Sequence, residues 1–410
     1  MPPNQNQPAY IRLINQAGRV LERAGLSVPT LDAKRLIHRA QWRTGLRDFG
    51  DNDYLEGLER LTDELHTHAN LSLVGKLAAY FNLTENLCAR MNLVEYRRQH
   101  PEILTETINR PLFILGLPRT GTTILFELIA QDPAMRYPAS WEVAKPVPPA
   151  LRGTYETDGR IRTVERFMGL AEQLSPGFRA IHTIGAQLPQ ECVYIFASQF
   201  ASEQFGYMFD IPQYRDWILD RDMTDAYRWH AQFLQHMQAD YRGEHWVLKT
   251  PSHLAYLRYL LAQYPDANIV WTHRQPIDAI ASLSSLATNL RGGFSDTVNP
   301  KAVAAHEMQH FAKQLNMGMQ QRRQLDRGQF LDISFASICD DPIDSVRGIY
   351  HYFDIPLSGE AESRMRDYLV KRPRDLHGKH DYCADQFALT RARESDLFRD
   401  YLDRFAPLLA

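Results

Sequence analysis

A glycine-containing stretch between an apolar run and a helical pattern constrains the fold of this chain more than any other feature. Residues 111–133 read PLFILGLPRTGTTILFELIAQDP. The apolar run at 112–117 is typical of a buried parallel strand, and the pattern at 122–130 is typical of a helix. A tight turn from strand to helix points the free N–H groups of the helix N-terminus at one place, where the helix dipole favours an anion. The stretch therefore predicts an anion site at the carboxyl end of a strand.

The loop differs at one position from loops that bind nucleoside triphosphates. Gly116 and Gly121 have the spacing of the pattern G-x-x-x-x-G-K-[ST], but Thr122 stands at the position of the lysine. Without that lysine, a triphosphate loses a charge-assisted contact worth about 1.5–3 kcal/mol. The donors that remain are Arg119, Thr120, Thr122 and Thr123. They suit a less charged group such as a 5′-phosphosulfate, and a tight turn without a ligand is the alternative.

Two further strand-to-helix junctions carry a basic residue. Lys249 follows an apolar run at 246–248, and Arg274 follows another at 269–272. Ligands in open α/β sheets bind at the carboxyl ends of the strands. We therefore expect Lys249 and Arg274 to lie in the same crevice as the glycine-containing loop.

Ser282 completes a second predicted anion site. It lies eight residues beyond Arg274, on a predicted helix that begins at Pro276. An arginine and a hydroxyl that converge near one helix start can bind a phosphate. A salt bridge between Arg274 and Asp278 is the structural alternative.

The alternation of short apolar runs and helical patterns predicts an α/β fold. The fourth run lies at 330–333, and residues 10–100 show helical spacing throughout. We expect a P-loop-like parallel sheet flanked by helices, with a helical N-terminal region. The predicted boundaries are 1–105 for the helical region and 106–410 for the α/β domain, with a helical acceptor-site insert at about 150–240.

Taken in this order, the motifs resemble those of sulfotransferases that use 3′-phosphoadenosine 5′-phosphosulfate (PAPS), above all the large bacterial-type members. LPRTGTT resembles the family's loop for the 5′-phosphosulfate, and HRQPIDAIAS resembles its site for the 3′-phosphate. The resemblance implies that Arg119 and residues 120–123 hold the 5′-phosphosulfate, and that Arg274 and Ser282 hold the 3′-phosphate. The late segment HGKHDYCADQFAL resembles that of the bacterial members, which adds Lys379 and His380 as further contacts to the 3′-phosphate.

The resemblance also assigns catalytic roles. Lys249 is expected to stabilise the charge that develops on the leaving phosphate oxygen. Cytosolic members carry a histidine base two residues after this lysine, but Pro251 stands there in this chain. Protein-tyrosine sulfotransferases carry a glutamate shortly after the loop helix, and this similarity makes Glu142 the preferred base, ahead of His253. An ion pair with Lys145 would be the structural role of Glu142.

The acceptor is expected to be a small molecule with a hydroxyl, a lipophilic alcohol or phenol. Aromatic side chains between 178 and 229 suit an apolar pocket, although ordinary core explains them equally well. His182 and Glu191 are either polar groups of the acceptor site or helix caps.

Two other enzyme classes compete with this interpretation. HEMQH places His306, Glu307 and His310 in the H-E-x-x-H pattern of zinc peptidases. No downstream glutamate occurs between 311 and 358 to serve as the usual third ligand, so we interpret this segment as an exposed helix face. A P-loop kinase or NTPase is the other alternative, and the missing lysine argues against it.

Composition sets the remaining expectations. A net charge of −3 predicts no affinity for nucleic acid, and no apolar run is long enough to span a membrane. The four cysteines are far apart, and the polar N-terminus lacks a signal-peptide pattern. We expect a cytoplasmic protein that needs no metal. The sequence leaves its oligomeric state open, homo-oligomers included.

Overall fold

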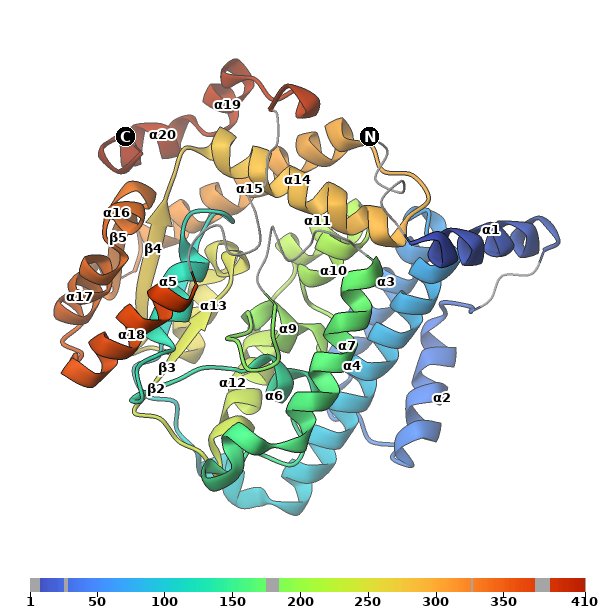
Figure 1. The fold of residues 1–410 in the computed structure, drawn as a ribbon, viewed down its shortest axis with the longest axis horizontal. Coiled ribbons are helices and arrows are strands. Elements are labelled where there is room, and N and C mark those ends of the chain that lie inside the picture. The colour runs from blue at the N-terminus through green and yellow to red at the C-terminus, as the bar shows by residue number, and fades with distance from the viewer. Residues whose placement is uncertain (1–7, 26–28, 175–183, 326, 373–383, 410) are drawn as a thin grey trace.

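A five-stranded parallel sheet forms the centre of the molecule (Figure 1). The computed structural model describes residues 8–25, 29–174, 184–325, 327–372 and 384–409. The strand order is β2-β3-β1-β4-β5. The strands are β1 (Leu112–Gly116), β2 (Met135–Arg136), β3 (His245–Lys249), β4 (Asn268–His273) and β5 (Phe330–Ser334). The predicted α/β fold is confirmed, and the four predicted strands match β1, β3, β4 and β5.

Both faces of the sheet are buried, as the apolar runs predicted. Along β1, Phe113 and Leu115 belong to one hydrophobic core, and Leu112 and Ile114 belong to a second core on the other face. Since both faces need apolar side chains, the strand is continuously hydrophobic rather than alternating. Helices from the second half of the chain cover the sheet: α13 (Leu257–Gln263), α14 (Pro276–Phe294), α15 (Pro300–Arg322), α16 (Phe335–Asp340), α17 (Pro342–Tyr352) and α18 (Gly359–Lys371).

Helices also follow the strands where the sequence predicted them. Helix α5 (Thr122–Ile129) follows β1, and α14 begins at Pro276 as expected. The segment after β3 starts as a 3₁₀ helix, Pro251–Tyr256, before α13 continues it. The C-terminal helices are α19 (Arg391–Leu397) and α20 (Arg399–Phe405).

The N-terminal region is helical, as predicted. Its helices are α1 (Ala9–Arg23), α2 (Ala33–Thr44), α3 (Leu55–Thr67) and α4 (Leu73–Gln99). Helix α2 ends where Gly45 adopts the left-handed conformation with φ 71°. Side chains from α2, α3 and α4 share one hydrophobic core with β1 and β4. The division at residue 105 stays a prediction, and the core is continuous across it.

The region predicted as an insert contains several short helices: α6 (Ser140–Ala144), α7 (Gly159–Leu174), α9 (Cys192–Ala197), α10 (Gln204–Met208), α11 (Pro212–Asp220) and α12 (Thr224–Gln238). Most of its aromatic side chains are core residues. Phe196, Phe200, Phe205, Phe209 and Tyr214 are buried in the large core cluster. The sequence left open whether these aromatic residues line an apolar pocket or belong to the core. For these five residues, the interpretation as ordinary core is correct. Within the described part of the chain, no helix has the length and apolar character needed to cross a membrane.

The interpretation of the HEMQH segment as an exposed helix face is wrong. Glu307 is fully buried on α15 and accepts hydrogen bonds from Arg215 (2.7 Å) and Arg291 (3.1 Å). His310 is also buried, and its Nε2 lies 3.1 Å from the carboxylate of Glu203. Sequence spacing could not show this, because the arginines come from α11 and α14. The network ties three helices together through buried charges.

Burial opposes a charge on Glu307, but Arg215 and Arg291 outweigh it and lower the pKa of Glu307 to about 2. The Glu307→Gln substitution leaves two buried arginines short of a partner. We expect it to lower the free energy of unfolding at pH 7 by about 3–5 kcal/mol, measured by urea denaturation. The exposed Glu360, which pairs with Arg364, provides the control, because Glu360→Gln should cost under about 1 kcal/mol.

The pH dependence of the stability difference between the wild type and Glu307→Gln provides a second test of the network. The folded pKa of Glu307 lies below its ordinary value of 4.5, so its contribution is complete above about pH 4.5 and is lost as the pH falls toward 2. The stability of the wild type should therefore approach that of Glu307→Gln in acid. Equal stability of the two proteins at pH 7 would contradict the role assigned to the network.

Candidate active site

The loop between β1 and α5 is shaped by two glycines and by its contact with β4. Gly116 has φ 149°, and a Cβ atom there would lie 2.4 Å from Oγ1 of Thr272. Gly121 has φ 86° and caps the N-terminus of α5. Only glycine suits both the conformation and the close approach at Gly116. The turn therefore brings the start of α5 directly over the carboxyl end of the sheet.

The hydroxyl of Thr120 holds this loop in place. It donates to the carbonyl of Leu117 at 2.6 Å and lies 2.6 Å from Oγ1 of Thr272. Thr120 is fully buried, so its hydroxyl points at the sheet rather than at a ligand. Thr122, at the first position of α5, is buried as well, whereas Thr123 is half-buried. Thr272 was not singled out from the sequence, and no motif indicated it.

Arg119, Arg274 and Ser282 meet beside the loop. Nε of Arg119 donates to Oγ of Ser282 at 3.1 Å, and Arg274 donates to the backbone carbonyl of Arg119 at 2.8 Å. The guanidinium of Arg274 also lies 4.2 Å from the ring centre of Phe335. Among the described residues, Asp278 forms no ion pair with Arg274. Two guanidinium groups and a hydroxyl therefore converge near the start of α14.

Lys249 lies at the carboxyl end of β3, on the other side of the loop. Its ammonium donates to Oγ1 of Thr123 at 3.3 Å and forms an ion pair with Glu191. The second carboxylate oxygen of Glu191 accepts a bond from Thr250 at 3.3 Å. Glu191 stands at the N-cap position of α9, but its side chain makes no capping bond there. The structure therefore does not support the helix-cap role of Glu191, and its role in an acceptor site stays a prediction.

A small cavity of about 30 Å³ adjoins this group. Its polar lining includes Thr123, Glu191 and Lys249, together with Glu127, Ser140 and Gln190. Apolar and aromatic side chains form much of the rest, including Phe126, Met168, Leu188 and Tyr194. A carboxylate and an ammonium thus face a partly apolar space at the end of the sheet.

Glu142 lies elsewhere, in a buried ion pair. Both of its oxygens bond to Arg136, and one also accepts from the hydroxyl of Tyr155 at 2.8 Å. Burial opposes the charge of Arg136, but Glu142 raises its pKa above the ordinary value. Lys145, the expected structural partner of Glu142, pairs with Glu85 instead.

His253 lies in an aromatic cluster inside the core. Its Nδ1 is 2.6 Å from the hydroxyl of Tyr227, and its ring packs edge-on against Phe113 at 5.0 Å. The side chain is fully buried. Burial, with His230 nearby, lowers the pKa of His253 well below its usual value, so the imidazole is neutral. His182, Lys379 and His380 lie outside the described residues.

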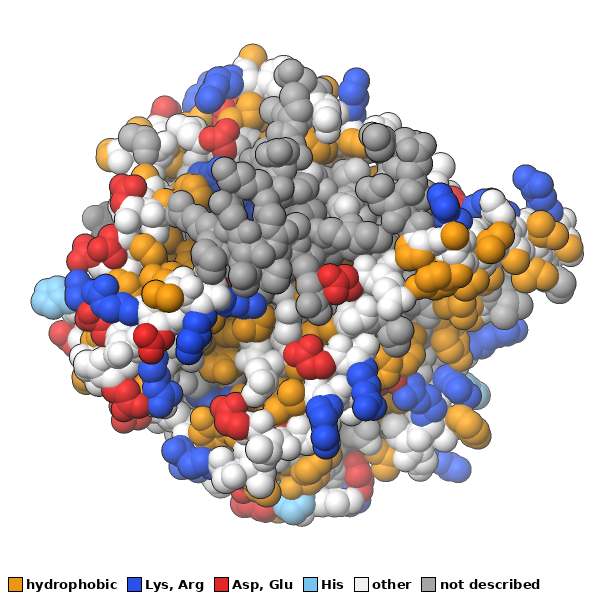
Figure 2. Space-filling view, viewed as in Figure 1, with side chains coloured by type: hydrophobic (Ala, Val, Ile, Leu, Met, Phe, Trp, Pro, Cys, Tyr) orange, Lys and Arg blue, Asp and Glu red, His pale blue; other side chains and the backbone are white. Residues whose placement is uncertain are grey.

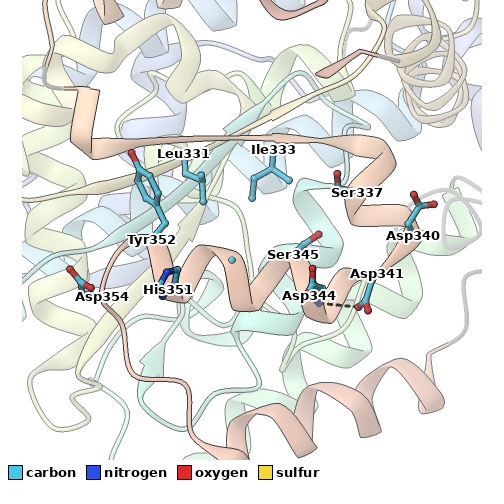
Figure 3. A pocket seen from close by; sticks show the side chains of 11 residues that line it. Leu331, Ile333, Ser337, Asp340, Asp341, Asp344, Ser345, His351, Tyr352 and Asp354 are labelled. Atoms are coloured by element: carbon cyan, nitrogen blue, oxygen red, sulfur yellow. Dashed lines mark hydrogen bonds between the residues drawn. The ribbon is translucent and has the colours of Figure 1, made fainter. Parts of the chain in front are cut away.

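A larger cavity, of about 760 Å³, lies between β5 and α17 (Figure 3). Four aspartates face it: Asp340, Asp341, Asp344 and Asp354. The described residues that line this cavity include no lysine or arginine. A phosphate would be repelled there, whereas two guanidinium groups lie beside the loop.

Comparison with known proteins agrees with this geometry. A sequence profile of the sulfotransferase family matches residues 111–359, which contain the loop, Lys249, Arg274 and Ser282. The chain belongs to the sulfotransferase family and is a sulfotransferase enzyme. The profile thus spans the whole of the described anion site.

Proteins that are similar to this chain include mycobacterial sulfotransferases. Sulfotransferase STF1 from Mycobacterium tuberculosis is 31% identical, with a TM-score of 0.81 over 90% of this chain and 98% of the other. STF9 from Mycobacterium avium is 29% identical, with a TM-score of 0.84 over 92% and 98%. Omega-hydroxy-beta-dihydromenaquinone-9 sulfotransferase Stf3 from Mycobacterium bovis is 24% identical over 72% of this chain and 74% of its own. The peptidase and NTPase alternatives receive no support from these matches.

The contrast between Thr120 and Thr123 leads to a prediction. Thr120→Val leaves the Leu117 carbonyl and the Thr272 hydroxyl without their buried partner, so we expect the free energy of unfolding to fall by about 1–3 kcal/mol. Thr123→Val is the matched control, since it removes one long bond from a half-buried site and should cost less than about 1 kcal/mol. Chemical denaturation of both variants measures the difference. A larger loss in Thr123→Val would contradict the role of Thr120 as the residue that fixes the loop.

Proposed function

We propose that this sulfotransferase moves a sulfuryl group from PAPS to a hydroxyl of a lipophilic alcohol or phenol. The observation that carries the proposal is the convergence of Arg119, Arg274 and Ser282 beside a glycine loop that lacks the usual lysine. The loop provides one anion site at the start of α5, and the arginines provide another next to it. A donor with phosphate groups at two separate positions of its nucleoside fits this pair of sites better than a linear triphosphate does.

The residues present fit PAPS group by group. The N-terminus of α5, with Thr122 and Thr123, would hold the 5′-phosphosulfate. Arg274 and Ser282 would hold the 3′-phosphate, with Arg119 between the two sites. Lys379 and His380 stay predictions for the same phosphate. When bound, PAPS supplies the sulfuryl group, and the protein supplies positioning and charge.

Lys249 is proposed to stabilise the leaving group. Its ammonium contacts Thr123 in the first turn of α5, which is the helix end expected to face the 5′-phosphosulfate. Negative charge that grows on a phosphate oxygen there would meet a fixed positive charge that is almost completely buried. Such a charge is more effective than one in water, because the surroundings screen it less.

Glu191 is proposed to accept the proton of the acceptor hydroxyl. It pairs with Lys249 and faces the small cavity where the acceptor would enter. Glu142 is less suited to this role than we expected from the sequence, because Arg136 and Tyr155 already occupy its oxygens. His253 is also less suited, because it is enclosed in the core and bonded to Tyr227.

Two observations support a lipophilic acceptor. Phe126, Met168 and Tyr194 line the cavity next to Glu191. The name of the Stf3 relative describes a hydroxylated menaquinone derivative as its acceptor. A cytoplasmic location is part of the proposal, and the three cysteines in the described residues are unpaired thiols, which suits a reducing compartment.

The role of Glu191 predicts a specific kinetic effect. Glu191→Gln should lower kcat about 10²–10⁴-fold, since general base catalysis contributes about that much. It should leave the Kd for 3′,5′-diphosphoadenosine nearly unchanged. Turnover would be followed as release of that nucleotide from PAPS in the presence of a panel of lipophilic phenols and alcohols.

Glu142→Gln is the matched comparison. It breaks a buried ion pair, so we expect lower stability, while the folded variant should keep a kcat much closer to that of the wild type. If Glu191→Gln kept full activity and folded Glu142→Gln lost it, the base would be Glu142 after all.

A further inference from the structure

Helix α1 packs on α4 by one narrow face, and two side chains outside that face also make contacts, since Tyr10 donates to Gln173 and Arg19 pairs with Asp296. Ile11 and Asn15 are buried, and Oδ1 of Asn15 accepts a bond from the backbone N–H of Val74 at 3.0 Å. Gly18 lies against Leu73, where an added Cβ would be 2.4 Å away. These residues, spaced four and three apart, form one side of the helix and attach it to α4. The rest of the helix faces outward.

The outward side of α1 is apolar to an unusual degree. Its exposed large hydrophobic side chains are Tyr10, Leu13, Ile14, Val20 and Leu21. Leu13 and Val20 are 65% and 64% exposed. At 100° per residue, these positions share one arc of the helix, next to the attached side. Figure 2 shows hydrophobic side chains gathered along α1 and continuing onto the surface below it.

Arginines occupy the remaining arc of α1. Arg12, Arg19 and Arg23 are exposed at helical spacing, on the side opposite Ile14 and Leu21, and of these Arg19 forms an ion pair with Asp296 at 2.8 Å. The exposed surface of α1 is therefore half apolar and half basic. That division is typical of helices that lie in the interface of a membrane, with the apolar side in the acyl region and the basic side among the headgroups.

Helix α2, which lies below α1 in Figure 1, has the same combination of side chains. Trp42 is 74% exposed, and Arg39 stacks on its ring at 4.5 Å. Lys34 and Arg35 are exposed on the same helix. An exposed tryptophan among basic residues is characteristic of the membrane–water boundary.

We propose that α1 and α2 form a docking surface for an anionic lipid bilayer. Residues 1–50 contain eight Lys and Arg residues against three Asp and Glu residues, although the whole chain has a net charge of −3. The positive charge is thus concentrated where the apolar side chains are exposed. Anionic headgroups complement this charge, and the acyl region accommodates the apolar arc.

A second copy of the chain is a poorer partner for this surface. A symmetric dimer through α1 and α2 would place the same basic surface on both sides of the contact, where like charges repel. A membrane has no such penalty. The inference rests on α1 and α2 alone. If the proposed function is correct as well, the surface would bring the enzyme to a membrane that holds lipophilic acceptors.

The test is co-sedimentation of the full chain with vesicles. One set contains phosphatidylcholine and phosphatidylglycerol, and the other contains phosphatidylcholine alone. We expect binding to the anionic set that weakens as salt is added, since exposed charges are screened. The double variant Leu13→Ser, Val20→Ser should reduce the partition coefficient at least about tenfold. Arg12→Gln with Arg23→Gln should reduce the preference for anionic vesicles.

A matched control shows whether a loss of vesicle binding is specific to α1 or follows the removal of any exposed apolar side chains. Leu104 and Val370 are exposed by 58% and 81% on other parts of the molecule, so the double variant Leu104→Ser, Val370→Ser should bind vesicles as the wild type does. Circular dichroism and thermal melting show whether each variant is folded, and the arginine variant tests the surface independently of the apolar one.

Three results would overturn the proposal: no vesicle binding by the wild type, equal loss in the two serine variants, or a wild-type dimer that becomes monomeric only in Leu13→Ser, Val20→Ser. The last result, from analytical ultracentrifugation, would assign the surface to self-association. Vesicle binding needs neither PAPS nor an acceptor, so its failure would leave the proposed reaction untouched.

Discussion

The contact between the loop after β1 and the end of β4 is the constraint on which the site depends. The two strands are neighbours in the sheet, and Gly116 lets the loop lie directly against Thr272. The hydroxyls of Thr120 and Thr272 then join the loop to β4. The chain continues from Thr272 through His273 to Arg274, so the same contact sets the distance between the loop and the second basic group. One pair of buried hydroxyls thus fixes the loop relative to the basic residue that follows β4.

Much of the positive charge near the loop comes from the neighbouring strands, in addition to Arg119 of the loop itself. Thr122 occupies the position of the usual lysine, while Lys249 reaches Thr123 from the end of β3. Arg274 reaches the loop from the other side, after β4. A charge at the end of β3 can pair with Glu191, which lies in the long insert between β2 and β3. The lysine of this chain therefore lies beside a carboxylate as well as beside the loop.

The sequence predicted the parts of the molecule that are local. Apolar runs located the four longer strands, and the rule that ligands bind at carboxyl ends placed Lys249, Arg274 and the loop together. The spacing of Arg274 and Ser282 indicated that they share a helix start, and both are found beside Arg119. In each case the relevant contact follows from strand order or helical spacing.

The sequence could not predict contacts made by the insert and by buried charges. Glu142 pairs with Arg136 rather than Lys145, although both are close in sequence, because Arg136 points into the same interior. Glu191 reaches Lys249 across 58 positions. Glu307 pairs with arginines on two other helices, so a motif that resembled a metal site proved to be a structural network. Such pairs depend on how helices pack, which no local pattern records.

The central claim is that the basic group beside the loop recognises a 3′-phosphate. Calorimetric titration of the wild type and Arg274→Ala with 3′,5′-diphosphoadenosine and with ADP tests it most directly, because the two ligands carry the same number of phosphates in different places. We predict that the wild type binds the 3′,5′-diphosphate more tightly, and that Arg274→Ala removes this preference while changing ADP binding little. Tighter binding of ADP by the wild type, or equal losses for both ligands in the variant, would contradict the account.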